Sequence, residues 1–192
     1  DPSYGSMNNL IANNTIIMPA GAGHTVSMRH GSTGNTFRNN ILIHMDPSNN
    51  DSIAIDTASF SAAFSSNYNI VTRFENTAGN IRSLAQWRTD TGGQDLNSIA
   101  VTAATAPALF TNFAGKIFTL STTSSALNAG TAVAQVTADI VGTSRPQGAA
   151  YDIGAYETVS GNTAPGAPTA VIATAGVGQV SVAFTAPASN GG

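Results

Sequence analysis

Three aspartates, Asp46, Asp51 and Asp56, follow one another at intervals of five residues. Carboxylate oxygens are the ligands that Ca²⁺ prefers, and a calcium ion takes about six to eight of them. Basic residues, among them His44 and Arg73, stand near these aspartates in the sequence. The segment therefore holds the parts of a candidate Ca²⁺ site, provided that several oxygens converge on one point.

An offset of 27 residues gives the same charges a structural interpretation. Opposite charges that face each other in adjacent strands stabilise a sheet by roughly 0.2 to 1 kcal/mol per pair. Each carboxylate then has a basic neighbour, so we expect structural ion pairs and no cofactor, with Ca²⁺ as the alternative. Adding 27 residues brings three pairs into register: Arg29 with Asp56, Asp46 with Arg73, and His24 with Asp51.

Charged residues near the end of the first 157 residues also favour a structural role. The guanidinium of Arg145 is a planar fork that suits a carboxylate, so we expect it to bond Asp152 or Asp139. Such a bond would fix the closing part of the fold. Ion-pair networks of this kind perturb charged groups without any catalytic purpose.

Other chemical signals in the sequence are weak. The histidines His24, His30 and His44 show no helical metal-ligand spacing, and the chain has no cysteine to complete a zinc site. No nucleophile elbow, phosphate loop or dinucleotide fingerprint is present. The single tryptophan, Trp87, is expected to fill the core, because large aromatic rings favour burial over a role as an exposed sugar platform.

The elements that position these residues recur along the chain. Residues 9–17 match residues 35–43 at an offset of 26, and residues 64–70 form a weaker third copy. A second pattern repeats Val26–Met28 as Ile53–Ile55, 27 residues later. Three columns result: Ile11, Phe37 and Phe64; Ile17, Ile43 and Ile70; and Asn14, Asn40 and Asn67.

This repeat predicts an all-β fold in which short strands stack as a parallel β-solenoid. Neighbouring turns of such a stack lie about 4.8 Å apart, so a side chain meets its counterpart one period later. We expect the apolar columns inside, and the asparagines as a hydrogen-bonded ladder at the bends. No stretch predicts an amphipathic helix.

The chain resembles the right-handed parallel β-helix proteins of the pectate-lyase-like superfamily. Its later part is similar to the end of bacterial secreted β-helix proteins of the choice-of-anchor type. The resemblance implies one β-helix over residues 1–157 and includes polysaccharide lyases, which combine Ca²⁺ with an Arg or Lys that abstracts a proton. It rests on residues 107–110, 118–120, 125–130, 139–148 and 151–157.

A Pro/Gly linker at residues 158–168 separates this region from a different kind of segment. Residues 169–174 and 179–185 alternate apolar and polar side chains about Gly176–Gly178, which predicts a β-hairpin. Residues 169–192 are similar to the first two strands of a bacterial fibronectin type III domain. A complete domain of that kind needs about seven strands.

Composition limits the choice of function. Only 9% of the residues are charged, the net charge is −3 and 42% are hydrophobic, so no basic surface for nucleic acid is expected. No apolar run is long enough to span a membrane. A weakly charged surface rich in Asn, Ser and Thr suits an extracellular protein, and the family resemblance makes a bacterial secreted or surface protein the expectation.

Three classes of function follow. The first is a noncatalytic structural or adhesive module that self-associates through an open solenoid end near Met7–Ile17 and through its C-terminal strands, giving filaments. The second is a carbohydrate-binding module, and the third is a polysaccharide lyase. We expect the first, because the sequence supplies repeats and no catalytic constellation.

Overall fold

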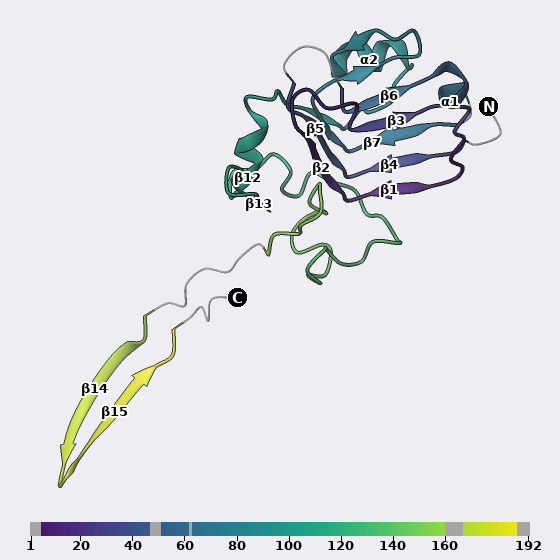
Figure 1. Cartoon of the computed structure of the whole chain (residues 1–192). Helices are drawn as coiled ribbons and strands as arrows, with labels where there is room; N and C mark the ends of the chain where they lie inside the picture. Colours follow the sequence, from purple (N-terminus) through teal and green to yellow (C-terminus); the bar gives the residue numbers. More distant parts are fainter. Residues whose placement is uncertain (1–4, 47–50, 62, 160–166, 188–192) are drawn as a thin grey trace. The chain divides into compact units, whose positions relative to one another are not determined.

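The computed structural model describes residues 5–46, 51–61, 63–159 and 167–187, and the regular secondary structure of these parts is mostly β-strand (Figure 1). The chain divides after Thr158 into two compact units. In the first unit, three consecutive stretches of chain, each called a pass, run through the same three sheets in the same order. Among the described helices, none is long and apolar enough to cross a membrane.

The three sheets of the first unit are built from strands of two to four residues. Strand pairs between residues 9 and 71 are all parallel, and only β10 pairs in the antiparallel sense, with β9. The first sheet contains β1 (Leu10–Ala12), β4 (Thr36–Arg38) and β7 (Ser65–Asn67); the second β2 (Thr15–Met18), β5 (Ile41–His44), β8 (Ile70–Val71) and β11 (Ile99–Ala100); the third β3 (Val26–Met28), β6 (Ile53–Ile55), β9 (Phe74–Glu75) and β10 (Ile81–Arg82).

The register confirms the repeat for the first two passes and corrects it for the third. Val26 pairs with Ile53, and Ile11 pairs with Phe37, as the two offsets predict. Phe37, however, pairs with Ser66 and not with Phe64. The reason is a helix, α1 (Thr57–Ser61), inserted between β6 and β7, which lengthens this pass of the chain.

Two helices lie where no helix was expected. The longer, α2 (Leu84–Asp90), begins with a capping box, in which the Ser83 hydroxyl accepts from the Gln86 N–H and the Gln86 side chain accepts from the Ser83 N–H. This Ser-x-x-Gln pattern is a sequence-level helix signal. The helix is only seven residues long and buries two side chains, Leu84 and Trp87, so its sequence lacks the long apolar stripe that would predict a helix.

Buried aliphatic and aromatic side chains form the interior of the first unit. Phe37, Phe64 and Trp87 belong to one cluster, with the Phe37 and Phe64 ring centroids 5.7 Å apart. Trp87 is fully buried and stacks on Phe74 at 4.5 Å, which confirms its role in the core. Of the seven positions predicted to be inside, five are buried and two in the first pass are half-buried: Phe37, Ile43, Ile53, Phe64 and Ile70, then Ile11 and Ile17.

The closing part of the first unit covers one side of the second sheet. It contains a short 3₁₀ helix (Ala106–Leu109) and the antiparallel pair β12 (Phe110–Asn112) and β13 (Ile117–Leu120). Ile153 joins Ile41 in a second buried cluster. Gly154 has φ 105°, and a Cβ there would lie 2.7 Å from Ile41 Cδ1, so only glycine fits this close approach.

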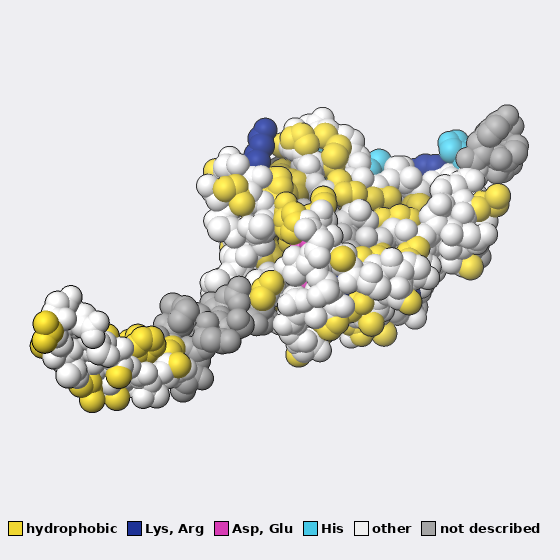
Figure 2. Space-filling view, turned by 90° about the horizontal axis from the view of Figure 1, so that it is seen from below, with side chains coloured by type: hydrophobic (Ala, Val, Ile, Leu, Met, Phe, Trp, Pro, Cys, Tyr) yellow, Lys and Arg dark blue, Asp and Glu magenta, His cyan; other side chains and the backbone are white. Residues whose placement is uncertain are grey.

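The second unit is described over a single antiparallel hairpin, β14 (Thr169–Gly176) and β15 (Gln179–Thr185). Every residue of both strands is exposed, including the large side chains of Val171, Val182 and Phe184. Figure 2 shows hydrophobic side chains on the surface of the hairpin. The predicted hairpin is therefore present, and its large apolar side chains are exposed.

Candidate functional site

The first and second sheets meet at a bend of two residues that recurs in each pass. Asn13, Asn39 and Tyr68 occupy its first position with φ of 54°, 54° and 58°. Asparagine tolerates this left-handed conformation better than most residues, because its short polar side chain can bond locally. In all three passes an asparagine follows the left-handed residue, so the bend places amide groups directly above one another.

These amides form a ladder between passes. Asn40 Oδ1 accepts from the backbone N–H and from Nδ2 of Asn14, both at 3.0 Å. Asn69 Oδ1 accepts in the same way from Asn40, at 2.9 and 3.0 Å, and the Asn69 N–H donates to Ser98 Oγ at 2.8 Å. Asn9 makes the same two bonds to Asn35 before β1 and β4.

The third member of the ladder is Asn69, and the predicted member Asn67 is wrong. The passes are 29 residues apart here, and the assumed offset of 27 therefore selects the wrong asparagine. Asn67 lies on β7 opposite Arg38, where its side-chain oxygen accepts from the backbone N–H of Tyr68 and of Asn97. It supports the rim of a groove on the outer face of the first sheet.

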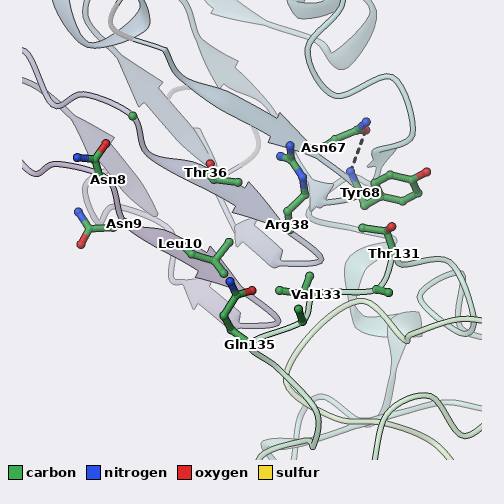
Figure 3. Close-up of a pocket in the computed structure, with 13 residues that line it drawn as sticks. Asn8, Asn9, Leu10, Thr36, Arg38, Asn67, Tyr68, Thr131, Val133 and Gln135 are labelled. Atoms are coloured by element: carbon green, nitrogen blue, oxygen red, sulfur yellow. Dashed lines mark hydrogen bonds between the residues drawn. The ribbon is translucent and has the colours of Figure 1, made fainter.

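This groove is a cavity of about 570 Å³ between the strands of the first sheet and residues 131–135 (Figure 3). Its floor includes the outward side chains of Leu10 and Arg38, and Tyr68 and Gln135 stand on its walls. Amide, guanidinium and aromatic groups gathered along a shallow face are suited to hydroxyl-rich ligands. The described residues that line the groove include no carboxylate or histidine, so they offer no acid and base pair.

Arg38 is held in place at the floor of the groove. Its guanidinium donates to the Phe37 carbonyl at 2.8 Å and to Ser65 Oγ at 2.7 Å. Partial burial lowers the pKa of Arg38 from its usual value, while the charge of Asp95 opposes that shift. An arginine stays protonated at any physiological pH, so the groove carries one fixed positive charge.

A second group of charged side chains lies along the third sheet. His24 Nδ1 and Asp51 Oδ1 are 3.0 Å apart, which confirms the pair that the 27-residue offset predicts. Arg29 Nη2 makes its ion pair with Glu75 Oε1 at 2.8 Å, and this partner was not expected. His24 Nε2 also lies 4.0 Å from Glu75 Oε2, so three passes contribute to one cluster.

The predicted pair of Arg29 with Asp56 makes no ion-pair contact. Asp56 instead accepts from the backbone N–H groups of His30 and Ser59, at 2.8 and 2.7 Å. Burial acts to raise the pKa of Asp56, but these hydrogen bonds and the charge of Arg29 outweigh it and lower the pKa. Arg29 is thus an electrostatic neighbour of Asp56, although its contact is with Glu75.

Two further predicted pairs meet through backbone atoms. The guanidinium of Arg73 donates to the Asp46 carbonyl at 2.7 Å, so the two residues are neighbours across adjacent passes. Arg145 donates to the Asp152 carbonyl at 3.0 Å, but its carboxylate partner is Glu157, at 2.7 Å. The prediction of a carboxylate bond from Arg145 to Asp152 or Asp139 is therefore wrong, because Glu157 fills that place.

Asp51 is the buried member of the charged cluster along the third sheet. The side chain is wholly buried, and burial raises the pKa of Asp51, although the neighbouring His24 works against the rise. Asp46 and Asp56 are not part of the cluster that Asp51 forms with His24 and Glu75. The three aspartates of the predicted Ca²⁺ site are therefore not the residues that the described structure brings together.

No family model, curated protein or solved structure matches the chain. The resemblance to pectate-lyase-like β-helices and to fibronectin type III domains therefore remains a prediction from the sequence.

Proposed function

We propose that the chain is a noncatalytic structural or adhesive module of a bacterial secreted or surface protein, built on a right-handed parallel β-helix. The observation that supports this best is the order of the strands: three consecutive passes enter the same three sheets in the same order and pair in parallel. Connections between parallel strands are right-handed in about 98% of cases, which favours the same hand here.

The use of the charged side chains supports a structural role. Arg29, Arg82 and Arg145 each contact a carboxylate within 2.8 Å, and the guanidinium of Arg88 donates to three backbone carbonyls. The Arg29–Glu75 pair joins two passes, and the other contacts fix local segments. Groups held in this way are poorly placed to accept or release protons in a reaction. The groove, which is the other candidate site, has no acid and base pair among its described lining residues.

Self-association is the part of the proposal that can be tested first. Strands β1, β2 and β3 are each the terminal strand of their sheet, and the hairpin of the second unit exposes the apolar side chains of Val182 and Phe184. Free strand edges are templates for pairing with another chain. The hairpin of one copy would then add to an edge of the next, and repetition of a head-to-tail contact gives a filament.

The experiment compares the full chain with a form that lacks residues 161–192, by light scattering over a range of concentrations and by electron microscopy. Assembly of the full chain, lost on deletion while the circular dichroism of the first unit persists, would support the adhesive role. A full chain that stays monomeric at all concentrations would refute self-association. Turnover of a uronate polysaccharide by the purified chain would refute the noncatalytic role.

Carbohydrate binding is a second candidate, favoured by the groove over the first sheet. Tyr68 offers a ring at its wall, and the amides of Asn8, Asn9 and Gln135 offer hydrogen bonds to hydroxyl groups. A glycan array should then show binding that Tyr68→Asn abolishes, since asparagine also tolerates the φ of 58° at this position. The matched control is Tyr156→Asn, because Tyr156 does not line the groove. Equal binding by both variants would exclude the groove.

A further inference from the structure

The charged cluster of the third sheet has the composition of a transition-metal site. His24, Asp51 and Glu75 each offer one ligand atom, and these atoms all lie within 4.8 Å of one another. His24 comes shortly before β3, Asp51 shortly before β6, and Glu75 ends β9, so the three ligands come from three successive passes. A stacked register thus gathers residues that are far apart in the sequence.

Asp51 supplies an independent reason to expect a cation. Its side chain is wholly buried, and its Oδ2 has no hydrogen-bond partner among the residues that the structure describes, while Oδ1 faces His24. Almost every buried polar atom in a native protein has a partner, and an exception calls for a bound water or ion. A buried carboxylate oxygen that lacks a donor, next to an imidazole and a second carboxylate, is suited to a metal ion.

From this arrangement we propose that His24, Asp51 and Glu75 bind one divalent transition-metal ion, with Zn²⁺ as the representative ion. Imidazole nitrogen suits zinc, copper, iron and nickel, whereas Ca²⁺ takes oxygen ligands almost alone. Zinc binds histidine and carboxylate ligands at about 2.0 to 2.2 Å, so its ligand atoms lie roughly 3.4 Å apart in a tetrahedral site. The ligand atoms lie within 4.8 Å of one another, so side-chain shifts of about 1 Å would bring them to that separation.

The site is open to solvent on one side, and one neighbouring positive charge competes with a bound ion. The side chain of His24 is 29% exposed and that of Glu75 is 15% exposed, so an ion can enter from solvent toward the buried Asp51. Arg29 occupies only one oxygen of Glu75, and its positive charge opposes a second cation. The ion would hold β3, β6 and β9 together, acting as a clamp across three passes of the chain.

The test uses the full chain, freed of metal by chelation, and titrates it with ZnCl₂ in a calorimeter. The cobalt form is followed by its visible absorption spectrum. We expect one equivalent of Zn²⁺ per chain, and a melting temperature raised by roughly 5 to 10 °C when free Zn²⁺ is 100 times Kd. A Co²⁺ spectrum typical of nitrogen and oxygen ligands should accompany it.

Variants identify the ligands. Asp51→Asn and His24→Gln should each weaken Zn²⁺ binding by about 100-fold or more, because even residues that only support a ligand contribute 10- to 100-fold. His24→Gln keeps the test valid if Asp51→Asn fails to fold, since His24 is partly exposed. His30→Gln is the matched control, because His30 is exposed and lies outside the cluster.

Arg29→Gln gives the sharpest readout, because it should tighten Zn²⁺ binding by freeing Glu75 and by removing a positive charge, an effect opposite to that of the ligand variants. Zn²⁺ binding that survives unchanged in both His24→Gln and Asp51→Asn would overturn the proposal. So would the absence of any Zn²⁺ effect on the wild-type chain, or stabilisation by Ca²⁺ alone.

Discussion

Replacing Asn40 by alanine tests the ladder that joins the passes of the chain. Asn40 is fully buried, and its side chain takes part in four hydrogen bonds. Its oxygen accepts twice from Asn14, and its nitrogen donates to the Ile11 carbonyl at 2.8 Å and to Asn69 Oδ1 at 3.0 Å. Alanine would remove all four bonds and leave the backbone N–H of Asn14 and the carbonyl of Ile11 without these partners.

The expected loss follows from these contacts. A hydrogen bond contributes about 1 kcal/mol net, and a buried group left without its partner costs about 1 to 3 kcal/mol. Asn40→Ala should therefore lower the free energy of unfolding by about 2 to 4 kcal/mol, partly offset because the neighbouring groups can relax. Asn14→Ala should cost under about 1 kcal/mol, since Asn14 is exposed and ends the ladder.

Urea unfolding followed by the fluorescence of Trp87 measures both variants. Trp87 is the single tryptophan of the chain and is fully buried, so its emission reports the first unit. The slope of the free energy against urea concentration should stay unchanged, as it does when only stability changes. Equal losses for Asn40→Ala and Asn14→Ala would refute the reasoning that the buried member carries the ladder.

Two other predictions concern the closing region. Glu157→Gln should destabilise the chain by about 3 to 5 kcal/mol in urea unfolding, because it leaves the buried guanidinium of Arg145 without its counter-charge; a loss below about 1 kcal/mol would contradict this. Burial acts to raise the pKa of Asp139, but the backbone N–H groups of Glu157, Thr143 and Val141 outweigh it and lower that pKa. The carboxylate therefore stabilises the fold above the pKa of the unfolded chain, about 3.9, and this contribution disappears as pH falls through the lower folded value. Asp139→Asn should weaken the loss of stability below pH ~4, measured by urea unfolding at several pH values, and an unchanged pH dependence would be the contrary result.

The sequence predicts the parts of the fold in which the spacing of the passes is constant. Val26–Met28 and Ile53–Ile55 pair as expected, and so do His24 and Asp51, because no insertion separates them within their pass. The prediction fails where local segments change the spacing. Helix α1 displaces the third pass, so Asn69 takes the place predicted for Asn67.

The sequence analysis did not predict Glu75 as a member of the charged cluster for a similar reason, a change in the spacing between passes. Ile53 pairs with Phe74, a shorter spacing than the one between β3 and β6, and this brings Glu75 to Arg29 and leaves Asp56 to bond backbone N–H groups. No fixed offset could have found Glu75. The Asn-rich bends of the first two passes, by contrast, could be predicted from the sequence, since Asn14 and Asn40 recur at the offset of 26 residues and do form the ladder.

The central claim is that successive passes of the chain stack in parallel with the register described above, and a cross-link tests it directly. The chain has no cysteine, and Thr36 pairs with Ser65 in adjacent strands, about 4.8 Å apart. In the doubly substituted chain carrying Thr36→Cys and Ser65→Cys, mass spectrometry after mild oxidation should find one disulfide, because this separation lies within the range that a disulfide spans.

The chain carrying Thr36→Cys and Asn67→Cys serves as the control, since its two positions are about 8 Å apart and too far to bridge. A disulfide in the first chain and none in the second is the result that the stacked register predicts. A disulfide only in the second chain, or an equal yield in both, would contradict it.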